Sequence, residues 1–255
     1  MKILKKIMVL VACVSMLLVG CTNSEEATGE NAIQKLNRAI AKTDDATHTT
    51  GKSIMGLEIL SDTDENMYVR VDMDFILNNL ADTKTGEAKV VMETDNSGMK
   101  DSITMYCKDG YMYTAASNQK VKTKLDEEDD SVTETTKLQS FGKSNMEDLT
   151  IEKDGTNQKV KVKLKDDVVK EFIADRLTEA LSGIVVTDDM IELDTTVVEY
   201  RIDTNGYVDT QGLSFSFTLK QNTQELKMKL YYKNTYSSFM KKSIDFPDFS
   251  DYEEQ

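Results

Sequence analysis

The 255-residue chain contains one proline, no tryptophan, one histidine and three cysteines. His48 has no second histidine and no nearby cysteine to complete a metal site, so we expect it at the surface or at a strand edge. The sequence has no Ser–His or Cys–His spacing and no glycine-rich phosphate loop. These absences argue against an enzyme, and they predict no catalytic residue, no metal and no cofactor.

Positive charge is also scarce, because 31 lysines and arginines face 45 acids and leave a formal charge of −14. Such a surface argues against nucleic acid as a partner and against electrostatic docking on anionic lipid. The acidic run Glu127–Asp130 lacks the alternating ligands and bend glycine of a calcium loop. We therefore interpret residues 118–144 as an irregular, solvated region.

Long apolar runs are missing except at the N-terminus. Residues 1–20 combine three lysines with the apolar run Ile7–Val19, which is the pattern of an export signal and is short for a membrane span. The run ends in Leu18-Val19-Gly20-Cys21, which resembles the lipobox of bacterial lipoproteins. That resemblance implies cleavage before Cys21 and lipid modification of Cys21. An ordinary signal peptide with an incidental cysteine is the alternative.

Two acyl chains on Cys21, at ~0.8 kcal/mol per buried CH₂, would hold the protein stably on a membrane. We therefore expect an extracytoplasmic protein, anchored through Cys21 and a tether of residues 21–29. Removing the signal takes away three lysines and no acid, so 235 residues with a charge of −17 remain. Cys107 is then the only thiol of the folded domain, and its apolar surroundings predict a buried side chain without a disulfide.

Alternation of apolar and polar residues dominates the rest and predicts antiparallel strands. The clearest stretch is 198–232, where a two-residue loop at Asn205-Gly206 places Val198 opposite Leu213. A second loop at Asn222-Thr223 places Phe217 opposite Met228 and Phe215 opposite Leu230. Further strands are expected near residues 55–59, 67–75 and 88–92, with hairpins over 99–115 and 149–164 and a linker over 184–193.

The turn at Lys108-Asp109-Gly110 allows two registers. A two-residue Asp-Gly loop would place Ile103, Met105, Cys107 and Met112 on one face, whereas a three-residue loop would replace Met112 there with Tyr111 and Tyr113. We favour the three-residue loop, because it leaves the opposite face more polar.

Helical spacing of apolar residues predicts two amphipathic helices, one between Glu30 and Thr43 and one over Val168–Leu181. A sheet this long should curl. We therefore predict an α+β, mainly β fold, in which one curved antiparallel sheet forms a half-barrel of about nine to eleven strands. The two helices are expected to cover its concave face. One domain spans residues 30–249, followed by an acidic tail over residues 250–255.

This pattern resembles the LolA/LppX-type superfamily of bacterial lipoprotein carriers and cell-envelope lipoproteins. The resemblance rests on the lipobox, the leading helix around Ile33–Ile40, the Tyr106–Tyr113 hairpin, the Val168–Leu181 helix and the Asn205-Gly206 meander. It implies a hydrophobic cavity between sheet and helices that binds or transfers a lipid or acyl chain.

Methionine is common on the rows expected to face inward, and its flexible side chain suits an irregular acyl chain. The alternative is that methionine only fills the space under the helices. The protein would then be a non-enzymatic structural or interaction lipoprotein that presents its polar surface to an envelope partner. The residues expected to form the cavity wall are Met67, Val69, Val71, Met73, Val90, Met92, Met105, Phe172, Leu177, Phe215, Phe217, Met228 and Leu230.

Overall fold

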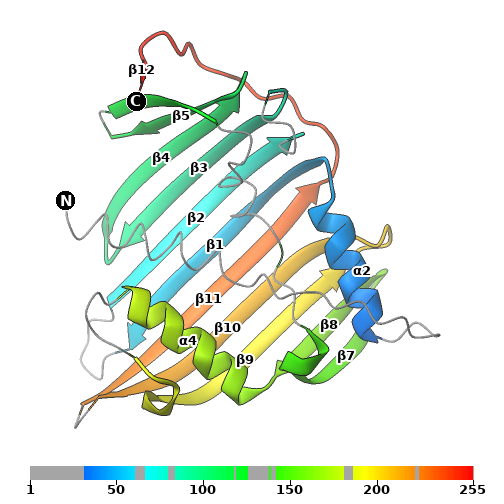
Figure 1. Ribbon diagram of the computed structural model, residues 1–255. Helices are drawn as coiled ribbons and strands as arrows, with labels where there is room; N and C mark the ends of the chain where they lie inside the picture. The colour runs from blue at the N-terminus through cyan, green and yellow to red at the C-terminus, as the bar shows by residue number, and fades with distance from the viewer. Residues whose placement is uncertain are drawn as a thin grey trace.

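The computed structural model describes residues 32–60, 67–79, 84–117, 119–125, 138, 142–180, 186–221 and 224–254. They form one 12-stranded sheet in the order β12-β6-β5-β4-β3-β2-β1-β11-β10-β9-β8-β7. The sheet is open and curved, and both α-helices lie on one of its faces (Figure 1). The predicted mainly β fold with a single curved antiparallel sheet is confirmed, although the strands outnumber the nine to eleven expected.

The sheet is built largely from neighbours in sequence. Its strands are β1 (His48–Leu60), β2 (Met67–Asn78), β3 (Glu87–Asn96), β4 (Met99–Lys108), β5 (Tyr111–Ala116), β6 (Gln119–Lys124), β7 (Met146–Asp154), β8 (Asn157–Leu164), β9 (Ile191–Ile202), β10 (Val208–Gln221), β11 (Gln224–Ser238) and β12 (Glu253–Glu254). The helices are α2 (Ala32–Asp44) and α4 (Asp166–Ala180), with 3-10 turns η1 (Lys143–Asn145) and η2 (Asp188–Met190).

The register predicted for the C-terminal meander is confirmed. Val198 lies opposite Leu213, Phe215 opposite Leu230, and Phe217 opposite Met228. Strand β11 then pairs with β1, which pairs with β2, so strands from early and late in the sequence are neighbours in the middle of the sheet. The face that carries these apolar residues also carries the helices, and we call it the inner face.

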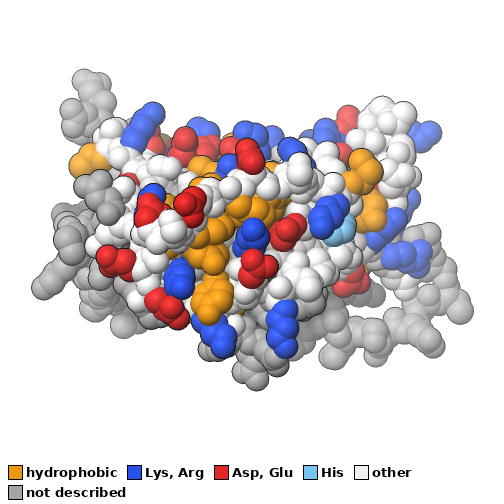
Figure 2. Space-filling model, turned by 90° about the horizontal axis from the view of Figure 1, so that it is seen from above, with side chains coloured by type: hydrophobic (Ala, Val, Ile, Leu, Met, Phe, Trp, Pro, Cys, Tyr) orange, Lys and Arg blue, Asp and Glu red, His pale blue; other side chains and the backbone are white. Residues whose placement is uncertain are grey.

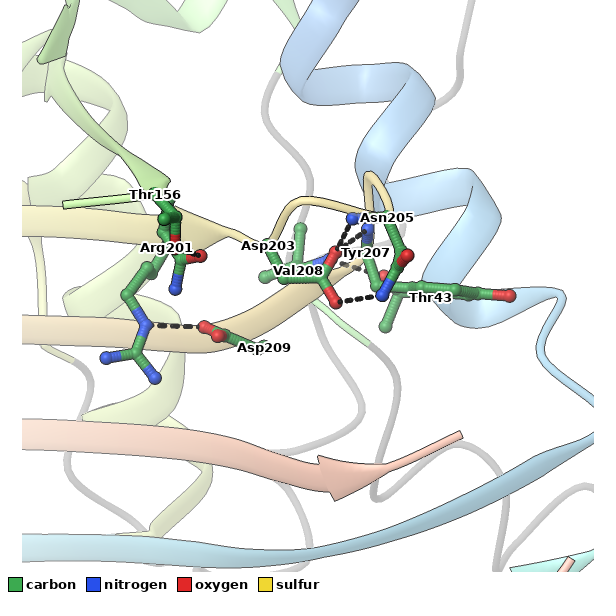
Figure 3. Close-up of polar contacts among 9 residues, drawn as sticks. Thr43, Thr156, Arg201, Asp203, Asn205, Tyr207, Val208 and Asp209 are labelled. Carbon is green, nitrogen blue, oxygen red and sulfur yellow. Dashed lines mark hydrogen bonds and ion pairs between the residues drawn. The ribbon is translucent and has the colours of Figure 1, made fainter. Parts of the chain in front are cut away.

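The two-residue loop predicted between β9 and β10 is wrong, although the strand register predicted from it is right. The loop has three residues: the Gly206 amide donates to the Asp203 carbonyl at 3.0 Å, and Gly206 has φ +82°. The Asp203 carboxylate accepts the amides of Asn205 and Tyr207 at 2.8 and 2.9 Å (Figure 3). A bulge between Val208 and Thr210 absorbs the extra residue and restores the pairing.

The hairpin between β4 and β5 also corrects a prediction. Tyr111 lies opposite Lys108 and Met112 opposite Cys107, so the loop has two residues and the favoured three-residue loop is wrong. Asp109 and Gly110 have φ of +52° and +77°, as a type I′ turn requires. Met112 therefore faces inward, while Tyr106, Tyr111 and Tyr113 lie on the outer face.

Tyr106 and Tyr113 are covered on the outer face by the C-terminal segment, which we call the C-terminal strap (residues 239–254). Phe249 stacks on Tyr113 with ring centroids 3.8 Å apart, and Tyr252 meets Tyr113 edge-on at 5.6 Å. The strap ends in β12, which pairs in parallel with β6. Residues 250–254 of the expected acidic tail thus include a buried residue, Tyr252, and a sheet strand.

The predictions for two short segments need correction. Residues 119–124, expected to be irregular, form strand β6, and β9 begins at Ile191 inside the expected linker. The acidic run Glu127–Asp130 and the N-terminal residues 1–31, with the lipobox and Cys21, lie outside the described residues.

Each helix presents an apolar stripe to the inner face. Leu36, Ala39 and Ile40 of α2 are buried, and the buried Thr43 hydroxyl accepts the Val208 amide at 2.8 Å while donating to the Ala39 carbonyl. Figure 3 shows Thr43 at this junction. In α4, Asp166 and Asp167 stand in the first turn, where acids favour the helix dipole.

Candidate functional site

The residues predicted to line a cavity all lie on the inner face or on α4, but they divide by burial. Most are packed in the core with at most 5% of their surface exposed: Val71, Met73, Val90, Leu177, Phe215, Phe217 and Met228. Five are half-buried, and all of these except Val69 pack against that core: Val69, Met92, Met105, Phe172 and Leu230. Met67 is 59% exposed at the start of β2 and does not line an enclosed space.

The half-buried residues follow the sheet from β11 to β4. Leu230 lies opposite Leu57, which lies opposite Val69, while Met105 lies opposite the buried Val90. Leu57 and Met112, which the sequence-based wall omits, belong to the same surface. The Asp109-Gly110 dipeptide, which favours a two-residue loop, is the sequence feature that could have placed Met112 on the inner face. We call these residues, Leu57, Val69, Met92, Met105, Met112 and Leu230, the inner apolar strip.

The helices cover the other half of the inner face. Helix α4 packs on β9 and η2, and α2 packs on β7 and β10. Phe172 of α4 lies 6.0 Å from Phe215 of β10, ring centroid to ring centroid. In Figure 1 both helices lie toward the β7–β11 side of the sheet. The expected cover of the concave face is therefore concentrated on that side, and the inner apolar strip runs beside it from β11 to β5.

Hydrophobic side chains also reach the molecular surface. Seen from above, they gather in the middle of the visible face, with Lys, Arg, Asp and Glu side chains on both sides (Figure 2). The ion pairs of the sheet include Lys52–Asp74 at 2.8 Å and Lys159–Glu199 at 2.8 Å, both between side chains that are substantially exposed. Surface pairs of this kind add little stability but keep the outer face polar.

A buried polar row crosses the inner face between the apolar residues. The Ser53 hydroxyl donates to the Asn234 side chain, and Gln211 is fully buried beside them. Burial raises the pKa of Tyr200, Tyr232 and Tyr236 well above the usual tyrosine range. For Tyr200, a hydrogen bond from Gln211 lowers the pKa, but burial has the larger effect. These groups stay neutral and give the core fixed hydrogen-bonding positions.

Cys107 is buried, as predicted. His48 begins β1 and is half-buried, in agreement with the expected strand edge. It lines a pocket of about 600 Å³ together with Arg38, Tyr207 and Phe239 at the end of α2. A larger pocket of about 860 Å³ lies on the outer face.

Two kinds of feature are missing from the described residues. No described helix is long and apolar enough to cross a membrane. Within the same part of the chain, no three His, Cys, Asp or Glu side chains are grouped so that they could hold a metal ion.

The fold and the inner apolar strip define a class: an open, curved antiparallel sheet with helices on one face and half-buried apolar residues beside them. Within that class, the chain belongs to the family of unknown function DUF6612, whose model matches residues 30–248. No curated protein matches the chain. The crystal structure of Rv2717c from M. tuberculosis is similar at 12% identity over 78% of this chain and 98% of that chain. Its TM-score of 0.21 is too low to support an argument.

Proposed function

We propose that the protein is a lipid-anchored, non-enzymatic protein of the bacterial cell envelope that binds an apolar ligand, such as a lipid acyl chain, on its inner face. The observation that carries this proposal is the inner apolar strip, whose six half-buried side chains run from β11 to β5 beside the part of the sheet that the helices cover. A LolA/LppX-like role fits the same architecture, with a curved sheet and helices on the concave side.

The chemistry of the strip suits a flexible chain. Three of its six residues are methionines, Met92, Met105 and Met112, whose unbranched side chains adapt to irregular apolar surfaces. Each methylene removed from water contributes ~0.8 kcal/mol. A ligand that buries about eight methylenes on the strip would gain roughly 6 kcal/mol before ordering costs, which sets the tightest Kd at tens of micromolar.

The proposed anchor supplies the location. The lipobox and Cys21 precede α2 by about ten residues, which span at most ~35 Å when extended. Such a tether would keep the inner face within reach of the membrane from which a lipid ligand would be taken.

Fluorescent fatty-acid binding to the full-length chain in detergent tests the proposal. Met92→Gln and Met105→Gln keep the side-chain length but make the strip polar, so we expect binding about tenfold weaker in the double variant, from the loss of a little over 1 kcal/mol. Met240→Gln is the matched control, because Met240 is 76% exposed and outside the strip. Equal binding by the double variant and the wild type would contradict the proposal.

A second candidate has its own observation: seven of the predicted wall residues are packed in the core. This favours an interaction lipoprotein with a filled core, which would present its polar outer face to an envelope protein. For such a protein the Met92→Gln/Met105→Gln variant would lose stability only, and no bound lipid would be recovered from the wild type.

A further inference from the structure

The outer face carries a pocket that the proposed function does not use. It has a volume of about 860 Å³, and its walls include Glu58, Tyr68, Arg70, Glu93 and Tyr231. Along the strands these residues alternate with residues of the inner face, so the pocket opens on the opposite side of the sheet from the apolar strip. Its volume falls within the range of ~300–1,000 Å³ that is typical of small-molecule sites.

The sequence provides an aromatic wall at this point by placing a glycine opposite a tyrosine. Gly56 of β1 lies opposite Tyr231 of β11 on one side and Arg70 of β2 on the other. A Cβ at Gly56 would stand 2.5 Å from Cζ and from the hydroxyl oxygen of Tyr231. The Tyr231 ring therefore crosses directly over Gly56, and any larger residue there would push it away. The ring already makes one cation–π contact, since the Lys229 ammonium nitrogen lies 5.6 Å from the ring centroid.

Polar groups of both kinds surround this ring. Arg70 is held in place by two hydrogen bonds to the Asp72 carboxylate, each 2.7 Å, which orient its remaining N–H donors. The Tyr68 side chain hydrogen-bonds to Asp95, which raises the tyrosine pKa. Lys100 and Ser102 add donors, while Glu58 and Glu93 add carboxylate acceptors.

We infer that this pocket binds a neutral saccharide. Five carboxylates against Arg70 and Lys100 give the lining a net negative charge, which disfavours an anion. Arg70 pairs with Asp72 at 2.7 Å and Lys100 with Asp95 at 4.0 Å, so two of the five carboxylates already have cationic partners in the lining itself. A sugar ring needs no charge match: its C–H face packs on an aromatic ring, and its hydroxyls both donate and accept hydrogen bonds. The combination of tyrosines, donors and acceptors meets these requirements.

An array of immobilised neutral glycans, probed with the detergent-purified full-length chain, tests the inference. We expect the wild type to bind at least one glycan, and Tyr231→Leu to bind it about tenfold more weakly because the aromatic wall is lost. Tyr231→Phe keeps the ring and should bind within about twofold of the wild type. Tyr111→Leu is the matched control, because Tyr111 is an outer-face tyrosine that does not line the pocket.

Arg70→Gln provides a second variant that leaves the ring untouched, and it should also weaken glycan binding severalfold. Folding of every variant is checked by its thermal unfolding curve. Absence of glycan binding by the wild type would overturn the inference. So would equal binding by the wild type, Tyr231→Leu and Arg70→Gln, because it would place the glycan elsewhere. Neither result bears on lipid binding at the inner apolar strip.

Discussion

Single residues in the middle strands determine how closely the chain packs there. Gly51 lies opposite Phe75 on one side and Tyr236 on the other, and it is buried. A Cβ at Gly51 would stand 2.4 Å from the Thr235 carbonyl oxygen and 2.6 Å from Cζ of Phe75. The space above this glycine is therefore already filled by an aromatic ring and by backbone.

Replacing this glycine should destabilise the fold. We expect Gly51→Ala to lower the free energy of unfolding by about 1–3 kcal/mol, because the added methyl group overpacks the core. Gly212→Ala is the control: no atom lies within 4 Å of the position that its added methyl group would take, so that variant should be neutral or slightly more stable. Urea unfolding of both variants measures the difference, and equal stability would contradict the packing described for Gly51.

The buried tyrosines predict a loss of stability at high pH. Burial raises the pKa of Tyr200, Tyr232 and Tyr236 in the folded state, whereas an unfolded tyrosine ionises near pH 10. The stability that these buried, neutral tyrosines contribute is complete below pH 10. It is lost above pH 10, because only the unfolded state then releases protons. Each tyrosine should reduce the unfolding free energy by about 1.4 kcal/mol per pH unit there.

Urea unfolding between pH 9 and pH 11 measures this slope. Tyr232→Phe should make it shallower by up to about 1.4 kcal/mol per pH unit above pH 10, since one buried hydroxyl is removed. If the slope is unchanged in that variant, Tyr232 does not titrate as its burial implies.

At the scale of elements, the strands and their partners were well predicted wherever apolar residues alternate strictly. The register of β9–β11 follows from Phe215, Phe217 and Met228, since a slip of one residue would expose the whole row. The same reasoning failed for β6, whose three lysines conceal the alternation, and for Tyr111 and Tyr113. On the outer face, Tyr113 packs against Phe249 and Tyr252 of a distant segment, and sequence periodicity carries no information about such a contact.

That segment, the C-terminal strap, should stabilise β4–β6. Phe249 stacks on Tyr113 at 3.8 Å and lies 5.7 Å from Tyr106 and 5.3 Å from Tyr252. Lys122 and Glu254 form an ion pair at 3.2 Å across β6 and β12. The strap thus protects an edge of the sheet that would otherwise be open.

Phe249→Ala should lower the unfolding free energy by about 2 kcal/mol, since it removes a partly buried ring from a cluster of four other aromatic rings. Met240→Ala in the same strap should change it by less than about 0.5 kcal/mol, because Met240 is 76% exposed. Thermal unfolding compares the two variants. A Phe249→Ala variant as stable as Met240→Ala would show that the strap does not support the sheet.

For the whole molecule, the curved sheet and its two faces followed from composition and periodicity. The part of the inner face that the two helices cover did not. The sequence contains two amphipathic helices, yet the side of the sheet that each covers depends on contacts between residues far apart, such as Thr43 with Val208. As a result, the predicted cavity wall divides into a packed core under the helices and a half-buried strip beside them. The strip is the part that the proposed ligand would occupy without rearranging the core.

Native mass spectrometry of the full-length chain, extracted from its own membranes in mild detergent, tests the central claim most directly. We predict a non-covalent lipid or acyl ligand that is released on collisional activation, separate from the covalent mass expected at Cys21. The ligand should be depleted in the Met92→Gln/Met105→Gln variant and retained in Met240→Gln. A wild-type chain that carries no such ligand, or one whose ligand persists in the double variant, would contradict the account.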